Sequence, residues 1–163
     1  MSEPKVPVAK HSERGEAVTA LVLDIFRLNA RLLSAGDGLV AELGLTSARW
    51  QVLGALAAAE RPQPVSHLAR DMGGHRQNVQ RIVNDLMKKG LVRFETNPHH
   101  RRAQLVVLTD AGRSAAEAAR ELQVGWVEDL AEGLDPDAIE TTRRIVGTLR
   151  SRLQVDGDRS DED

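Results

Sequence analysis

The 163-residue chain contains no cysteine and no tyrosine, and only 2% of its residues are aromatic. Without cysteine it has no disulfide, thiol nucleophile, thiol redox switch or thiolate zinc site. Because aromatic side chains are so few, the core has to be built from Leu, Val, Ala and Ile, which suits packed helices better than a β-sandwich. An apolar fraction of 41% is enough for one domain with helical extensions.

Long apolar runs and the common enzyme motifs are missing as well. No uninterrupted apolar segment approaches the length that crosses a bilayer, and the first residues lack the apolar stretch of a secretory signal. We therefore expect a cytoplasmic protein without a membrane partner. The chain also has no phosphate-binding glycine loop, no G-x-G-x-x-G after a strand and no H-E-x-x-H, so we expect neither an enzyme nor a cofactor.

Charge is unevenly distributed along the chain, although the net charge is only -2. Residues 66–109 carry eight Lys or Arg against three Asp or Glu, and four of the five histidines, whereas residues 110–163 carry seven against fourteen. A local basic block is the electrostatic footprint of phosphate contact, and an acidic end should face away from DNA. The pattern favours a nucleic-acid partner for the middle of the chain.

The segment 73–89 predicts a helix with two different faces. Its apolar residues recur at the spacing of a buried stripe, and they are Val79, Ile82, Val83, Leu86 and Met87. The other side carries cations and amides, which are Arg76, Gln77, Gln80, Arg81, Asn84 and Lys88. Arg, Gln and Asn can bond bidentately to base edges in a major groove, whereas Asp85 should turn away from DNA. The segment alone leaves two readings open, a DNA-reading helix and an ordinary solvated surface.

The neighbouring segments favour the DNA-reading helix. Ser66 is expected to cap a short helix over 67–72, with Val65 extended before it, and Gly73 with Gly74 forms the tight turn of a helix-turn-helix. Ser66 and His67 stand where a helix N-terminus can bind a phosphate, although Ser66 can equally be a cap and no more.

A basic hairpin is expected directly after this helix. Gly90 should end the helix, and the stretches 91–96 and 103–108 have the alternation and β-propensity of two strands. The loop between them places Arg101 and Arg102 at or near its tip. Together these segments predict a mainly α fold that contains a winged helix-turn-helix with a two-stranded β wing.

Amphipathic helices flank this unit on both sides. We expect a long helix over 16–33 that ends at the sequence SAGDG, a short helical piece near 39–43, and a further helix capped by Thr46. Thr109 and Asp135 should cap two C-terminal helices. The expected organisation is a flexible arm (1–15), N-terminal helices (16–45), the winged helix-turn-helix (46–109), C-terminal helices (110–155) and a disordered acidic tail (156–163).

Three stretches resemble the MarR family of dimeric bacterial transcription regulators. They are LTSARWQVLGAL, then VSHLARDMGGHRQNVQRIVNDLMKKGLVRF, then NPHHRRAQLVVLTDAGR, which match the helix, recognition helix and wing of that family in order and spacing. The resemblance implies a homodimer formed by the first and the last two helices, with each recognition helix in the major groove and each wing at the minor groove. It also implies a pseudo-palindromic operator with half-sites about one helical turn apart.

Carried over by position, the resemblance places His75, Arg76, Gln77, Asn78, Gln80 and Arg81 on the recognition face and Arg102 on the wing. The full set expected to contact DNA is Ser66, His67, His75, Arg76, Gln77, Asn78, Gln80, Arg81, Asn84, Lys88, Arg101 and Arg102. One position departs from the family pattern, since His100 stands where the wing usually has an Asp that orients the second arginine.

A ligand-responsive repressor of this kind would bind double-stranded DNA, a second copy of itself and a small-molecule effector. The resemblance suggests an effector cavity lined by Trp50 and Trp126, although both can be plain core. Arg31 and Arg49 could meet an anionic effector or lie on the surface. Two alternatives remain: a metal-responsive regulator that uses His67, His75, His99 and His100, and a winged helix that binds proteins.

Overall fold

The computed structural model describes residues 11–98, 100 and 102–157. The expected acidic tail and most of the expected N-terminal arm lie outside these residues. The chain divides into two units, Met1–Gln123 and Val124–Asp163, and each is described by itself. None of the described helices is long and apolar enough to cross a membrane.

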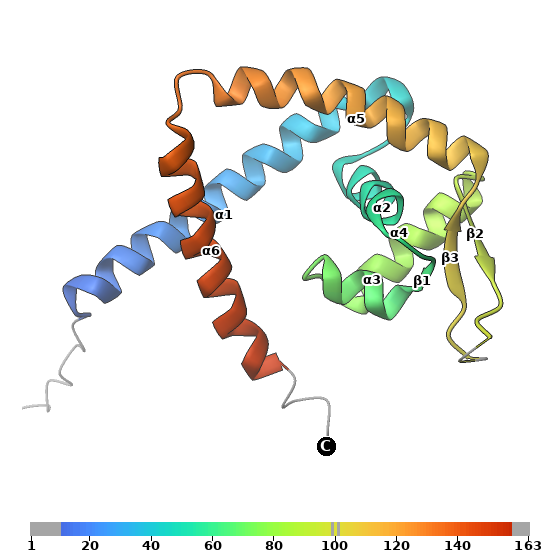
Figure 1. The fold of residues 1–163 in the computed structure, drawn as a ribbon, viewed down its shortest axis with the longest axis horizontal. Helices are drawn as coiled ribbons and strands as arrows, with labels where there is room; N and C mark the ends of the chain where they lie inside the picture. Colours follow the sequence, from blue (N-terminus) through green and yellow to red (C-terminus); the bar gives the residue numbers. More distant parts are fainter. Residues whose placement is uncertain (1–10, 99, 101, 158–163) are drawn as a thin grey trace, which may run out of the picture. The chain divides into compact units, whose positions relative to one another are not determined.

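The described part of the chain is mainly helical, as predicted (Figure 1). The elements of the first unit are α1 (Glu13–Leu39), a 3-10 turn η1 (Ala41–Leu43), α2 (Ser47–Ala58), β1 (Gln63–Pro64), α3 (Val65–Asp71), α4 (Arg76–Lys88), β2 (Val92–Glu95) and β3 (Leu105–Leu108). Helix α5 (Asp110–Ala131) crosses into the second unit, which also contains α6 (Pro136–Gly157).

The first helix runs through the sequence SAGDG instead of ending before it. Gly36 is buried, and a Cβ at this position would overlap the Ser47 hydroxyl, so the glycine allows α1 and α2 to approach closely. The Ser47 hydroxyl donates to the Leu33 carbonyl at 2.7 Å, and the Ser47 N–H donates to Asp37 Oδ1 at 2.6 Å. The predicted end near Leu33 is therefore wrong, because Gly36 serves packing and not termination.

Local end signals were read correctly at several other places. Thr46 caps α2 by accepting from the Arg49 N–H at 3.4 Å, and Thr109 caps α5 by accepting from the Gly112 N–H at 3.0 Å. Gly90 ends α4 as predicted, with φ of 72°, and Gly44 ends η1 with φ of 66°. Both have the left-handed conformation that glycine adopts without strain.

The sheet has three strands where two were predicted. Strand β3 pairs antiparallel with β2 over Val92–Glu95 and, on its other edge, with β1 through Gln63↔Val106 and Pro64↔Leu105. Val65, predicted to be extended, instead begins α3, and Pro64 occupies the N-cap position. The cap predicted for Ser66 is therefore wrong, since Ser66 is the second residue inside the helix.

The core of the first unit lies among α2, α3, α4 and the sheet. Its largest fully buried side chains are Val40, Val52, Leu53, Leu68, Val83, Leu86 and Val106. The predicted apolar stripe of α4 is confirmed for Val79, Val83 and Leu86, whereas Met87 is 43% exposed. Removing so much apolar surface from water is what holds α4 to the sheet and to α2, at about 25 cal/mol per Å².

Apolar side chains are also exposed on the long helices. On α1, Phe26, Leu28 and Leu23 have exposed fractions of 65%, 57% and 46%. On α6 no residue whose burial is described is buried, and Leu153 is 75% exposed. The units to which α1 and α6 belong leave these apolar side chains exposed.

Candidate nucleic-acid interface

Helices α3 and α4 form the helix-turn-helix that the sequence predicts (Figure 1). Leu68 and Ala69 of α3 are buried against the same core as α4. Gly73, with φ of 65°, makes the turn between them, and the Gly74 N–H donates to the Ala69 carbonyl at 2.8 Å. The two glycines form the turn, as predicted, and helix α4 begins at Arg76 with His75 as its N-cap residue.

The exposed side of α4 forms a groove lined by Arg76, Gln77, Gln80, Arg81, Asn84, Asp85 and Lys88. The structure therefore brings together the six cations and amides predicted for this face. Asn78 is exposed in the first turn, as is His75 just before it. Gln80 Nε2 donates to Asn84 Oδ1 at 3.0 Å, which turns the amide oxygen of Asn84 toward Gln80 and leaves its amide nitrogen to donate elsewhere.

Asp85 does not turn away from this face as predicted, because it lines the same groove. Its carboxylate Oδ2 lies 3.5 Å from the Nη2 atom of Arg49, which comes from the first turn of α2. Arg49 therefore contacts the recognition helix and does not line the cavity described below. Sequence spacing within α4 could not reveal this, since the partner is 36 residues away.

At the start of α3, Ser66 and His67 are both exposed. They lie in the first turn of a helix of seven residues whose N-cap makes no side-chain hydrogen bond. His75 was also predicted to contact DNA. It is the N-cap residue of α4, and its side chain makes no capping hydrogen bond. None of these three residues lines the α4 groove; they lie at the starts of α3 and α4.

The wing is the hairpin of β2 and β3. Arg93 of β2 donates to the Glu95 carboxylate at 2.6 Å and to the Leu108 carbonyl at 3.4 Å. In the connecting loop the His100 N–H donates to the Asn97 carbonyl at 3.3 Å, and the Ala103 N–H donates to the His100 carbonyl at 3.0 Å. His100 thus takes part in the loop turns through its backbone.

Arg102 lies within the turn that the Ala103 N–H and the His100 carbonyl close, and it is exposed. Arg101 and His99 lie outside the described residues. Among the described residues, no group of three or more His, Asp or Glu side chains is placed to hold a metal ion. His67, His75 and His100 are therefore not gathered into one site.

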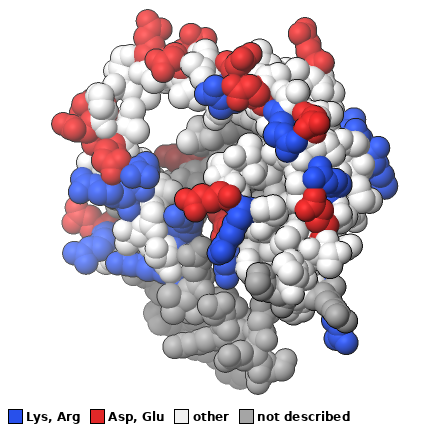
Figure 2. All heavy atoms as spheres, turned by 45° about the vertical axis from the view of Figure 1, so that its right-hand side comes forward, with Lys and Arg blue, Asp and Glu red and all other residues white. Residues whose placement is uncertain are grey.

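Basic and acidic side chains lie next to one another over much of the face drawn in Figure 2. Overall charge therefore does not by itself mark the interface. What distinguishes α4 is the composition of its exposed side, which has three cations and three amides around one carboxylate that is already paired.

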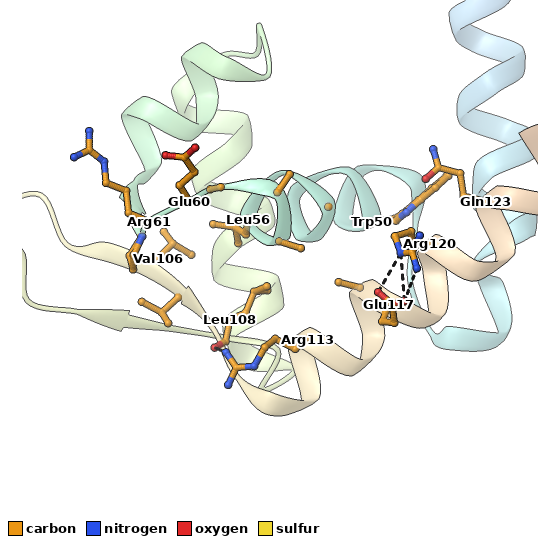
Figure 3. Close-up of a pocket in the computed structure, with 17 residues that line it drawn as sticks. Trp50, Leu56, Glu60, Arg61, Val106, Leu108, Arg113, Glu117, Arg120 and Gln123 are labelled. Carbon is orange, nitrogen blue, oxygen red and sulfur yellow. Dashed lines mark hydrogen bonds and ion pairs between the residues drawn. The ribbon is translucent and has the colours of Figure 1, made fainter.

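A cavity of about 850 Å³ lies beside α2, β3 and the first half of α5. Trp50, Leu56, Val106 and Leu108 line its apolar part, and Arg61, Arg113 and Arg120 bring cations to it (Figure 3). Of the residues predicted for an effector pocket, Trp50 lines this cavity, whereas Arg31 and Arg49 do not. Trp126 belongs to the second unit.

Glu117 and Arg120 face each other at the wall of this cavity, as the dashed lines in Figure 3 show. Arg120 Nη2 lies 2.7 Å from Glu117 Oε1. The hydrogen bond from Arg120, followed by the attraction of its charge, lowers the pKa of the Glu117 carboxyl below its usual value. The same hydrogen bond and charge raise the pKa of Arg120, so both groups stay charged at neutral pH.

One joint between the recognition helix and α5 was missed by sequence reasoning. The Thr109 hydroxyl donates to the Gly90 carbonyl at 2.7 Å, and the Thr109 N–H donates to the Leu91 carbonyl at 3.1 Å. Gly112 is buried against the same turn, where a Cβ would overlap the Leu91 carbonyl oxygen. The cap at Thr109 was predicted, but its second bond joins residues 19 positions apart and leaves no local signal.

The order of these elements, two crossed helices followed by a β hairpin, defines a winged helix-turn-helix. In helix-turn-helix proteins the second helix enters the major groove of DNA, and α4 is the second helix of this motif.

The comparisons with known proteins then assign the family. The model described as the MarR family matches residues 43–103. An uncharacterized protein of Mycobacterium tuberculosis is 38% identical over 128 residues, which cover 78% of this chain and 88% of that protein. The chain belongs to the MarR family of transcription regulators. Both the family and the fold are those of transcription regulators and not of enzymes.

Two further proteins are similar over most of the chain. The transcriptional activatory protein BadR of Rhodopseudomonas palustris is 26% identical over 145 residues, which cover 86% of this chain and 83% of that protein. The solved structure of the transcriptional repressor CouR bound to a 23-mer DNA duplex is 27% identical, with a TM-score of 0.69, and covers 86% of this chain and 99% of that one.

Proposed function

We propose that this chain binds a specific site in double-stranded DNA as a homodimer and represses transcription by occupying a promoter. The observation that carries the proposal is the α4 groove, which offers phosphates and base edges six cations and amides and one neutralised carboxylate. The similarity to CouR, whose structure contains a DNA duplex, supports it. The contacting residues we assign are those of this groove with Ser66, His67, His75, Asn78, Arg101 and Arg102.

The dimer is supported by apolar side chains that lie exposed on α1 of the first unit and on α6 of the second. Phe26, Leu28 and Leu23 of α1 are 65%, 57% and 46% exposed, and α6 exposes apolar residues along its length. Helices with apolar faces of this kind bury them against a partner. A second copy of the same chain places two α4 helices on one duplex and calls for a pseudo-palindromic site.

Repression would be released by a small molecule. The cavity of about 850 Å³ that Trp50 lines has the size of a ligand pocket and combines apolar walls with arginines. A ligand there changes DNA binding only if its affinity differs between a DNA-competent and an incompetent arrangement of the recognition helices. Transcription in vitro from a promoter that contains the site distinguishes repression, as in CouR, from activation, as in BadR.

Fluorescence anisotropy titrations on duplex DNA at several salt concentrations test the DNA interface. We expect the double variant Arg76→Ala/Arg81→Ala to bind at least tenfold more weakly than wild type, because each lost phosphate or base contact costs about 1–3 kcal/mol. The matched control is Arg150→Ala/Arg152→Ala, which removes the same charge from two exposed residues of α6. Because α6 is part of the proposed dimer surface, light scattering first checks that this control has the same oligomeric state as the wild type. Equal affinities for the two double variants would contradict the assignment of α4.

A further inference from the structure

Asp85 is the single carboxylate of α4 and lines the groove that we propose to face DNA. A carboxylate at this place opposes binding, because it brings a negative charge toward phosphates. Arg81 and Lys88 of the same groove form no ion pair among the described residues. The helix itself therefore supplies no cation that holds Asp85.

The cation comes from α2. Arg49 lies in the first turn of α2, where its N–H donates to the Thr46 side chain and so fixes the position of its own backbone. Its guanidinium reaches the Asp85 carboxylate at 3.5 Å, and the two side chains are 27% and 39% exposed. Arg49 is thus directed to the edge of the groove that α4 presents.

This ion pair contributes little to the stability of the contact between α2 and α4. At 3.5 Å it is a long single contact, and half-exposed ion pairs contribute little to stability. The helices are already held by a buried cluster that includes Leu53, Val83 and Leu86, which are fully buried. What the pair changes is the charge of the groove, which becomes cations and amides alone once Asp85 is neutralised.

We propose that Arg49 is a positioning residue for DNA binding that acts through Asp85: its guanidinium neutralises the carboxylate on the recognition face. The inference rests on the proposed function, since it assumes that the α4 groove contacts DNA. Two other roles of Arg49 are distinct from this one: a direct contact with a DNA phosphate, and a structural role in holding α2 to α4.

The test compares wild type with Arg49→Met, Asp85→Asn and the double variant, on a duplex that the wild-type protein has enriched from a random pool. We expect Arg49→Met to bind roughly three- to tenfold more weakly at low salt, because it exposes one negative charge to the phosphates. Asp85→Asn should bind at least as tightly as wild type. The double variant should match Asp85→Asn within about twofold, and salt should shrink the defect of Arg49→Met.

Each other outcome overturns the proposal in a recognisable way. An equal loss on Arg49→Met in both backgrounds means that Arg49 contacts DNA itself. A loss on Asp85→Asn as large as that on Arg49→Met means that the pair holds the helices together. Unchanged binding of Arg49→Met removes any role. A wild type that binds no duplex contradicts the proposed function and not the pair alone.

The control variant is Arg27→Met, which removes an arginine from an exposed ion pair of α1, where Arg27 and Asp24 are 75% and 71% exposed. It changes the net charge by the same amount as Arg49→Met and leaves the α4 groove intact. Because Arg27 lies between Phe26 and Leu28 of the proposed dimer surface, light scattering first checks that this variant has the same oligomeric state as the wild type. We expect it to bind DNA like wild type. If it weakens binding as Arg49→Met does, net charge accounts for both losses and the proposal is wrong.

Discussion

Single residues of the proposed interface offer DNA two different kinds of contact. Arg76 and Gln77 lie exposed in the first turn of α4, where side chains of a recognition helix reach base edges. Arg102 lies exposed in the wing loop and carries a positive charge. The first two should therefore contribute to sequence preference, and the third to affinity for any sequence.

Two substitutions separate these contributions. Gln77→Ala should lower the discrimination between base pairs at particular positions of the site by about 1–3 kcal/mol, because a bidentate amide contact is lost. Arg102→Ala should weaken binding to all sequences and reduce the salt slope by about one, because one fewer counterion is released. Titrations against the enriched duplex, its single-base variants and an unrelated duplex measure both effects, and a uniform loss on Gln77→Ala would contradict its assignment to a base.

The sequence predicted residues well where their role depends on near neighbours. Thr46 and Thr109 were identified as caps because each threonine hydroxyl accepts a hydrogen bond from an N–H only three residues further along the chain. The predictions for the cap at Ser66 and for the direction of Asp85 were wrong. Whether a serine caps a helix depends on where the chain leaves the sheet, and the place of Asp85 depends on an arginine of another helix.

At the scale of elements, the recognition helix is joined to α5 by a close contact of backbones. Thr109 bonds to Gly90 and Leu91, and Gly112 packs directly on Leu91. The same α5 carries Arg113, Glu117 and Arg120 along the cavity. A displacement of α5 would therefore be passed to the C-terminal end of α4 through this joint.

The joint has a direct test in stability. Gly112→Ala should lower the free energy of unfolding by about 1–3 kcal/mol, because the added methyl overlaps the Leu91 carbonyl and the backbone has to shift. Gly125→Ala, in the same helix with no atom within 4 Å of its Cβ position, should instead stabilise by about 0.5–1 kcal/mol, since alanine favours helices. Urea denaturation measures both, and a Gly112→Ala variant as stable as Gly125→Ala would contradict the close contact.

Element types were predictable, and element ends less so. The periodicities of 3.6 and 2 identified the helices and the hairpin in the correct order. The C-terminal end of α1 was predicted wrongly because of a glycine. A glycine can end a helix or let a second helix pack closely, and the sequence does not show that Gly36 does the latter. Strand β1 was missed because two residues carry no periodicity, and their pairing with β3 joins segments over 40 positions apart.

At the scale of the whole molecule, the chain combines a basic middle with an acidic C-terminal third. The structure explains how the middle contributes, since α4 collects cations and amides on one side while its apolar side enters the core. The partner of the exposed apolar faces of α1 and α6 could not be read from one chain. The family to which the chain belongs, and its similarity to a repressor bound to duplex DNA, support a second copy.

The most direct test of the DNA-binding dimer is a selection of bound fragments from random duplex DNA by the purified wild-type protein. The account predicts enrichment of an inverted repeat whose half-sites are centred about one helical turn apart, because two α4 helices related by a two-fold axis read the major groove from one side. Light scattering on the complex should then give two chains per duplex. Enrichment of no sequence, or of a single half-site bound by one chain, would contradict the account.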